Sequence, residues 1–256
     1  MQQMKDCKHH VTTGNDLIWL RVIDCETTGY DPDEDRVVEV GWSDIAFNKG
    51  IAVHDLTPES VDSMMVNPGI NIPPTASAVH HIVDSDVEDA LGIDEVLTKA
   101  LPEKPEFRYV VAHNAPFDQG FLDHEKKHTW LDTLRLAKHA FPDAPSYSNQ
   151  ALRYYLGLDV PRHLPAHRVE CDIITTGLIF VRICEELRQS RGDVNPGDLV
   201  VLQDEPILLK GKVGFGKYRD RKWEDLPRDY MEWMLKQGDD AWDKDIIHTI
   251  HHHLVG

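Results

Sequence analysis

The sequence contains no uninterrupted apolar stretch of the roughly 18 residues that a membrane-spanning helix needs, so we expect no membrane association. Its four cysteines, at positions 7, 25, 171 and 184, form no Cys-x-x-Cys pair and are irregularly spaced. That pattern argues against a zinc site and against a disulfide framework. The first 16 residues are polar and lack the apolar core of a secretory signal. Together these absences predict a protein of the reducing cytoplasm.

Positive charge is scarce as well. The chain has 27 lysines and arginines against 44 aspartates and glutamates, for a net charge of −17. So acidic a chain repels nucleic acid unless basic side chains gather locally or metal ions neutralise the contact surface. With 256 residues, of which 41% are apolar and 28% charged, the composition is that of a globular protein with room for a large domain and a small one.

Hydrophobic patterning predicts an α/β fold. Strands are expected where apolar or β-branched runs are bounded by turn residues, at 17–25, 37–47, 51–56 and 109–112. Helices are expected where apolar residues recur at helical spacing, at 85–101, 117–127, 132–139, 148–156 and 169–187. Strands followed by a strand that alternates with helices predict a mixed sheet with helices on both faces.

A change in composition divides the chain. The polar segment 191–207, which contains Gly and Pro, is expected to be a linker. It would join a main domain over 17–190 to a small C-terminal module over 208–256, which is expected to contain two short helices. Residues 1–16 would form an N-terminal extension.

Two acids end the first predicted strand. Asp24 and Glu26 stand two residues apart in VIDCETTG, and side chains at i and i+2 of a strand share one face. Paired carboxylates are ligands for hard ions such as Mg²⁺ or Mn²⁺. The same spacing recurs at Asp86 and Glu88 on a predicted helix surface, but only the first pair is carried to the C-terminal end of an apolar strand, where α/β sheets bind ligands. Cys25, between the first pair, is expected to point into the core on the opposite face.

Later segments add two acids and a histidine. Asp118 follows a buried strand in VAHNAPFD, where on its own it fits a helix N-cap better than a metal ligand. Asp172 stands in the first turn of the helix predicted at 169–187 and is expected to face the sheet. His167 belongs in the preceding loop, because a helical His167 would lie about 140° from Asp172 around the axis.

In this order, the motifs VIDCETTG, VAHNAPFD and HRVECD resemble the three signatures of the DnaQ-like 3′→5′ exonucleases of the DEDDh type. Further matches at Asp132-Thr133, at 147–152 and at 215–219 extend the resemblance over roughly 17–254 and point to one exodeoxyribonuclease branch of that family. The resemblance implies an RNase H-like fold with a mixed five-stranded sheet. It also implies release of nucleoside 5′-monophosphates from a 3′ end.

The same resemblance assigns roles to the site residues. Asp24, Glu26 and Asp172 are matched to ligands of a first Mg²⁺ or Mn²⁺ ion. Asp24 would bridge to a second ion, which Asp118 supports directly or through water. His167 is matched to the general base. Two ions about 3.5–4 Å apart can clamp the attacking water and the leaving oxygen of one phosphodiester, and they lower the pKa of the water enough for an imidazole to act as base.

Other residues are candidates for contact with the substrate. They are Thr27, Thr28, Gly29, His80, Asn114 and Phe117, together with Lys217, Tyr218 and Arg219. Gly29 is expected to make the turn after the acids. Two of these assignments have an alternative, since His80 fits a surface histidine equally well and Phe117 a core residue. His163 competes with His167 as the base but has a different spacing from Asp172.

The C-terminal module gathers the positive charge that the rest of the chain lacks. Residues 208–223 contain six basic residues and one acid, Asp220, a net +5 that leaves −22 on the remainder. Aromatic residues interleave with the basic ones, a combination that holds single strands. The alternative is a solvated basic turn over a small aromatic core, in which Trp223, Tyr230 and Trp233 pack inside.

The sequence therefore predicts a metal-dependent 3′→5′ exonuclease acting on single-stranded DNA or DNA 3′ ends, in DNA repair or degradation. Three alternatives stay open: an exoribonuclease on the same fold, a proofreading subunit of a DNA polymerase, and a non-catalytic nucleic-acid-binding module. No residue pattern indicates a pocket that reads the 2′-OH of RNA. The sequence does not indicate an oligomeric state.

Overall fold

The computed structural model describes residues 17–48, 51–53, 56–103, 108–238 and 241–255. The N-terminal extension expected over 1–16 lies outside the described residues. The chain divides into two compact units, with the boundary between Leu202 and Gln203.

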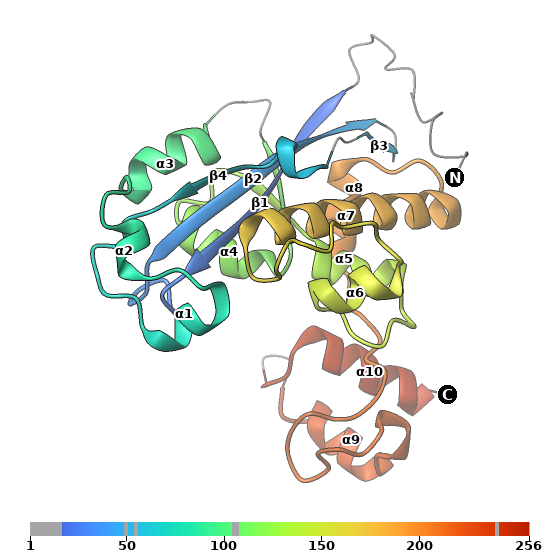
Figure 1. Cartoon of the computed structure of the whole chain (residues 1–256). Helices are drawn as coiled ribbons and strands as arrows, with labels where there is room; N and C mark the ends of the chain where they lie inside the picture. The colour runs from blue at the N-terminus through green and yellow to red at the C-terminus, as the bar shows by residue number, and fades with distance from the viewer. Residues whose placement is uncertain (1–16, 49–50, 54–55, 104–107, 239–240, 256) are drawn as a thin grey trace. The chain divides into compact units, whose positions relative to one another are not determined.

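One mixed sheet forms the centre of the first unit (Figure 1). Its strands are β1 (Ile18–Thr27), β2 (Val37–Asn48), β3 (Ile51–Val53), β4 (Asp62–Met65), β5 (Tyr109–Ala112) and β6 (Thr129–Asp132). The order is β3-β2-β1-β5-β6, with β1 antiparallel to β2 and parallel to β5. β3 and β4 pair with different parts of β2 on the edge away from β1. The described strands thus fill five positions, which confirms the predicted mixed five-stranded sheet.

Helices cover both faces of the sheet. One face carries α5 (Thr133–Ala140), α6 (Asn149–Tyr155), α7 (Val169–Arg191) and α8 (Pro196–Asp204). The other carries α3 (Ile93–Ala100) and α4 (Ala115–Leu122). Val22 packs in the first core and Cys25 in the second. Because successive strand residues alternate between faces, Asp24 and Glu26 continue the row of Val22 toward α7.

Shorter elements lie beside the first half of β2. They are the 3-10 turn η1 (Pro58–Ser60), α1 (Pro74–His80) and α2 (Asp84–Val87). Val87 of α2 shares a small core with Val38 of β2. The single helix predicted over 85–101 is wrong, because it is interrupted before α3, where Gly92 forms the extended N-cap.

The sequence analysis did not predict two of the strands, β6 and β4, and each omission has a physical reason. β6 runs directly into α5 at Thr133, so the helical spacing read over 132–139 concealed the strand before it. β4 has four residues that are only half-buried or exposed, so it shows no apolar alternation.

The prediction of a linker over 191–207 is wrong for most of its length. Residues 196–204 form α8, and Leu199 and Leu202 are buried in the same core as α7. Pro196 begins this helix, where the missing N–H of a proline costs nothing. The Asn-Pro-Gly sequence that indicated a loop therefore marks the start of a helix.

The second unit has a core of its own. It contains η3 (Trp223–Asp225), α9 (Arg228–Leu235) and α10 (Lys244–Val255). Their buried residues include Trp223, Met231, Met234 and Ile250. The two short helices expected in the module are present. Across the part of the chain that the structure describes, no helix has the length and apolar character needed to cross a bilayer.

Candidate active site

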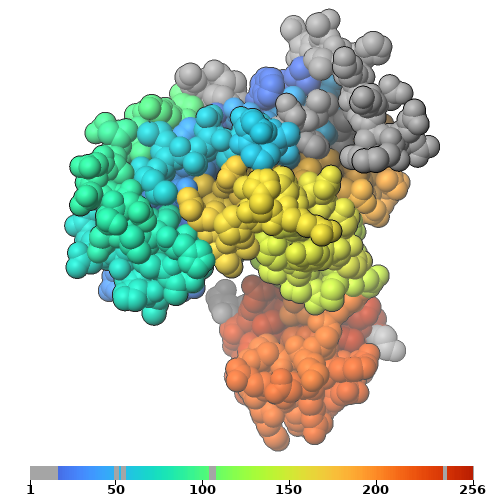
Figure 2. Space-filling view, viewed as in Figure 1, coloured from blue at the N-terminus to red at the C-terminus, as the bar shows by residue number. Residues whose placement is uncertain are grey.

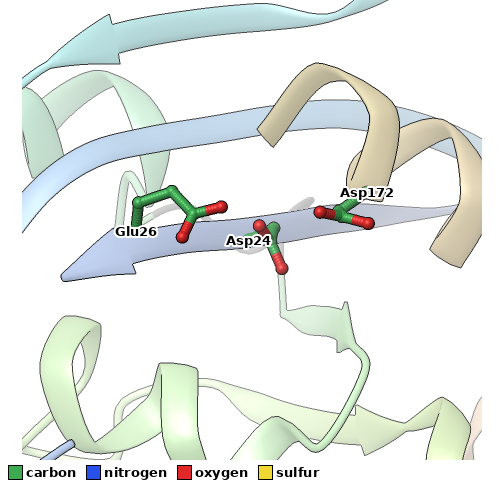
Figure 3. A group of neighbouring side chains, drawn as sticks. All are labelled: Asp24, Glu26 and Asp172. Carbon is green, nitrogen blue, oxygen red and sulfur yellow. The ribbon is translucent and has the colours of Figure 1, made fainter. Parts of the chain in front are cut away.

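Three carboxylates meet at the C-terminal end of β1. Asp24 and Glu26 project from the strand, and Asp172 reaches toward them from the first turn of α7 (Figure 3). Each contributes an oxygen that lies within 4.8 Å of the other two. An all-oxygen group of this kind suits a hard divalent cation.

Close packing between α7 and the sheet brings Asp172 to this place. Gly41 of β2 is opposite Asp24 in the strand register. A Cβ at Gly41 would lie only 2.7 Å from the Cβ of Val169, so a side chain there would push the start of α7 away. The N–H of His167 donates to Oδ2 of Asp172 at 2.9 Å and holds that carboxylate in place.

Burial and mutual repulsion raise the pKa values of these acids. Burial is the largest cause for Asp24, whose pKa is well above its ordinary value, and the charges of Asp118, Asp172 and Glu26 add to it. The pKa of Glu26 is raised to about 8, first by burial and then by the charge of Asp172. A bound cation would stabilise the ionised forms that the site otherwise disfavours. The donor set therefore fits a divalent metal.

Asp118 lies beside the group of three and contacts β1. From the first turn of α4, its Oδ1 accepts the backbone N–H of Cys25 at 3.1 Å. β1 pairs with β5 only as far as Val22, so this N–H lies beyond the last ladder pair. Burial raises the pKa of Asp118 to about 7. The N-cap of α4 is Asn114, so the N-cap interpretation of Asp118 is wrong.

Cys25 has a closer link to the acids than the sequence predicted. It is buried and packs on the face away from Asp24 and Glu26, as expected. Its thiol, however, donates to Oδ1 of Asp118 at 3.4 Å. Cys25 is therefore a neighbour of the acids as well as a core residue.

A pocket of about 410 Å³ adjoins the acids. It is lined by Cys25, Glu26, Thr27, Thr28, Gly29, Tyr30, Thr75, Ala76, Val79, His80, Phe117 and His167. Figure 2 shows that residues of the α1 region, in teal, and of the start of α7, in yellow, adjoin on this face of the molecule. His167, in the left-handed loop conformation (φ 61°) just before α7, reaches the pocket, whereas His163 is not among its described lining residues.

Most of the predicted substrate residues of the first unit line this pocket. Thr27, Thr28, Gly29, His80 and Phe117 do so. Asn114 is instead an exposed N-cap with a left-handed backbone (φ 66°), and its N–H donates to Asp132 at 2.9 Å. The structure thus brings five of the six to one cavity and places Asn114 in the turn that supports α4.

His80 is 2% exposed, so the interpretation of it as a surface histidine is wrong. Its Nδ1 accepts the N–H of Ile82 at 3.0 Å, so Nε2 carries the proton of the neutral ring. Burial lowers the pKa of His80 more than the neighbouring backbone of Thr27 raises it. The pocket therefore contains a neutral imidazole whose tautomer is fixed by the backbone.

Gly29 is needed for a reason other than the turn itself. A Cβ there would lie 2.3 Å from Oδ2 of Asp35. The hydroxyl of Thr28 donates to the same carboxylate at 3.0 Å, and the N–H of Arg36 donates to Thr28 at 2.9 Å. The glycine permits the close approach of Asp35, which closes the loop beside the pocket.

The sequence interpretation missed two features of the site. Tyr30 is 86% exposed at the pocket, with its ring centroid 6.3 Å from that of Phe117. Glu39, opposite Glu26 in the register, is buried and receives two hydrogen bonds of 3.2 Å from the guanidinium of Arg168. An acid inside an apolar strand needs a partner, and this was the available signal for the ion pair.

The remaining motif residues hold the fold together. The two ring nitrogens of His113 lie 2.8 Å from the hydroxyl of Thr133 and 2.8 Å from the carbonyl of Tyr147. Asp132 caps α5 by accepting the N–H of Leu134 at 2.9 Å. These contacts connect the segments at 132 and 147 to the loop that follows β5.

Lys217, Tyr218 and Arg219 belong to the second unit. Nζ of Lys217 lies 5.3 Å from the ring centroid of Tyr218. Nε of Arg219 donates to the carbonyl of Gly214 at 2.9 Å, within the same loop.

A mixed sheet whose first strand delivers an acid pair to the start of a long covering helix is the arrangement of the RNase H-like fold. The chain belongs to the exonuclease family, because the family model described as "Exonuclease" matches residues 22–180. A second model, described as "Putative quorum-sensing-regulated virulence factor", matches residues 206–241 in the second unit.

Individual relatives support this assignment. The chain is 28% identical to exodeoxyribonuclease 10 of Escherichia coli (strain K12) over 240 residues, which cover 92% of this chain and 98% of that protein. It is 32% identical to the DNA polymerase III PolC-type of Caldanaerobacter subterraneus subsp. tengcongensis over 175 residues, 66% of this chain but 12% of that protein. A solved structure of exonuclease X in complex with 5′ overhanging duplex DNA matches with a TM-score of 0.52 and 27% identity, over 72% of this chain and 99% of that one. These matches confirm the predicted family, its branch and its fold.

Proposed function

We propose that this chain is a metal-dependent 3′→5′ exonuclease that hydrolyses the phosphodiester bonds of DNA and releases nucleoside 5′-monophosphates. The observation that carries the proposal is the convergence of Asp24, Glu26 and Asp172 to within 4.8 Å. Three like charges at a pocket raise the free energy of the folded chain unless they serve a cation. The similarity to an exodeoxyribonuclease and to a DNA-bound exonuclease supports DNA as the substrate.

The acids would hold two divalent cations, Mg²⁺ or Mn²⁺. Asp24, Glu26 and Asp172 would hold the first, while Asp24 and Asp118 would hold the second. When bound, such ions polarise the phosphate, lower the pKa of a water and neutralise charge on the leaving oxygen. β1 and α7 would hold the three acids close together before the substrate binds. The cations would also remove the repulsion between an acidic chain and an anionic substrate.

His167 would act as the general base. Its imidazole lines the pocket beside Glu26, and its backbone N–H holds Asp172. One short segment therefore positions both a metal ligand and the base. A histidine positioned in this way is the usual general base for the proton of an attacking water.

The pocket of about 410 Å³ would receive the 3′-terminal nucleoside. Phe117 and Tyr30 offer aromatic rings to the base. His80 and the backbone between Thr27 and Gly29 offer hydrogen-bonding groups to the sugar or the base edge. Lys217, Tyr218 and Arg219 of the second unit would also contact the nucleic acid.

Degradation of a 5′-labelled single strand tests the proposal. In Mg²⁺ the strand should shorten stepwise from its 3′ end, and EDTA should keep it intact. A 3′-blocked strand should resist, and a 5′-blocked strand should not. Degradation of the 3′-blocked strand alone would contradict the polarity, and faster loss of a matched RNA in the same tube would favour the exoribonuclease alternative.

A matched pair of variants connects the activity to the site. Glu26→Ala should abolish turnover, whereas Glu88→Ala, from the exposed Asp-x-Glu pair on the surface, should not change it. Equal activity of both variants would contradict the assignment of the acids.

A further inference from the structure

The second unit divides its aromatic residues into an inner and an outer group. The inner group is part of the core: the ring centroid of Phe215 lies 6.1 Å from that of Trp223 and 5.2 Å from that of Trp242. Trp242 also donates from Nε1 to the carbonyl of Met234 at 3.0 Å. Packing of the hydrophobic core accounts for these rings.

The outer group forms a row that leads from the core to the surface: Tyr218 and Tyr230 are half-buried against the core, and Trp233 is exposed. Tyr218 meets Tyr230 edge-on, with centroids 4.6 Å apart. Tyr230 stacks on Trp233, with centroids 5.4 Å apart and an angle of 22° between the rings. Trp233 is 48% exposed, so the interpretation of it as a core residue is wrong. Tyr218, Tyr230 and Trp233 are called the aromatic row below.

Positive charge surrounds one end of the aromatic row. Nζ of Lys217 and Cζ of Arg221 each lie 5.3 Å from the ring centroid of Tyr218. The segment 208–223 has a net charge of +5 in a chain of −17. Glu232, which precedes Trp233, is paired with Arg228 at 3.0 Å. The segment 208–223 is thus opposite in charge to the chain as a whole, and it contacts the row at Tyr218.

We propose that the exposed end of the aromatic row, Trp233 stacked on Tyr230, is a stacking surface for the unpaired bases of a single-stranded nucleic acid, with Lys217 and Arg221 on its phosphates. The inference rests on the proposed function and deepens it, because it gives the second unit the task of holding the strand. Bases of any sequence present flat faces to Trp and Tyr, and cations beside the rings neutralise the backbone. An exposed indole also suits a protein partner, but the local positive charge favours a polyanion.

Binding by the full chain tests this surface. A labelled oligothymidylate of about 30 nucleotides is followed by fluorescence anisotropy in EDTA, so that the strand is not hydrolysed. Trp233→Ala should weaken binding about 5-fold to 100-fold, the range for one lost stacking contact. Trp233→Phe keeps an aromatic face and should remain within about 3-fold of the unmodified chain.

A control variant removes a comparable side chain from the first unit. Tyr154 is 77% exposed, and Cζ of Arg153 lies 5.6 Å from its ring centroid. Tyr154→Ala should leave the affinity unchanged, because this tyrosine is outside the aromatic row. A loss equal to that of Trp233→Ala would overturn the inference.

Two further measurements distinguish the remaining outcomes: binding of a blunt duplex, and hydrolysis by the unmodified chain. A blunt duplex hides its bases, so Trp233→Ala should have little effect on duplex binding, and an equal effect on duplex and single strand would overturn stacking. Unchanged single-strand affinity in Trp233→Ala would overturn the inference even if the unmodified chain degrades DNA. Absence of hydrolysis by the unmodified chain in Mg²⁺ would overturn the proposed function alone, since the binding assay needs no catalysis.

Discussion

The two units each contain a cluster of like charges, but the clusters are built differently. One is the group of acids at the end of β1, and the other is the basic loop of the second unit. In the first unit, half-buried carboxylates are held within 4.8 Å of one another, and their pKa values rise as a result. In the second, Lys217 and Arg221 are exposed and lie close to the ring of Tyr218. Hydrolysis needs fixed atoms, whereas holding a strand needs charge and flat surface. Substitutions in the first region should therefore change turnover, and those in the second should change affinity.

The largest effect is expected at the acids at the end of β1 and the start of α7. Asp24→Ala or Asp172→Ala removes a metal ligand and should lower turnover about 10⁴-fold or more, with the fold retained. Rates of release of mononucleotides, together with circular dichroism, measure both parts of this prediction. Retention of full activity by Asp24→Ala would refute the site.

His167→Ala should lower turnover about 10²-fold to 10⁴-fold, the usual contribution of a general base. The deficit should shrink at high pH, because hydroxide then replaces the missing base. A rate profile from pH 6 to about 10 measures it. His163→Ala is the control, and the assignment is wrong if that variant loses as much activity or if the His167→Ala deficit is the same at every pH.

A smaller effect is expected in the stability of the metal-free chain. The pKa of Glu26 is about 8 in the folded chain, above its ordinary value. At pH values below the pKa of Glu26 in both states, the folded and unfolded chains bind this proton equally. Between the two pKa values, the folded chain binds more of it than the unfolded chain does. The free energy of unfolding should therefore fall as the pH rises from about 5 to 8, lowering Tm by about 3 °C or more.

Thermal melts with and without Mg²⁺ check this dependence. The cation should raise Tm most at pH 8, where the carboxylates are ionised, and Glu26→Gln should flatten the metal-free profile. A metal-free Tm that rises over this range would contradict the repulsion argument.

The smallest effect is expected in the basic loop of the second unit. Lys217→Ala combined with Arg219→Ala removes two exposed cations and should weaken single-strand binding several-fold at low salt. The slope of log affinity against log salt should shrink by about 1 to 2 units. Binding titrations between about 50 and 200 mM salt measure the slope. An unchanged slope would mean that the basic loop does not contact phosphates.

The sequence predicted the chemistry of the site better than its surroundings. The alternation of β1 gave the common face of Asp24 and Glu26, because that face depends only on strand periodicity. The loop position of His167 followed from helical geometry. The contact between Cys25 and Asp118 did not follow, since it depends on where β5 stops pairing with β1.

Errors arose where local composition and long-range packing disagree. Asn-Pro-Gly at 195–197 indicated a loop, yet Leu199 and Leu202 are buried and α8 forms. The hydrophobicity of Trp233 indicated a core residue, yet the inner positions of that unit are filled by Phe215, Trp223 and Trp242. Neither outcome depends on residues that are adjacent in the chain.

By itself, the sequence determined which chemical groups are present and which face of its own strand or helix each one occupies, because both follow from covalent structure and local periodicity. Only the tertiary structure decided that Gly41 lets Val169 and the following turn of α7 approach the sheet, so that Asp172 meets Asp24. It also decided that Arg168 neutralises the buried Glu39. Such long-range contacts depend on how all the elements pack to bury their apolar surface, and the sequence of a single segment does not determine that packing.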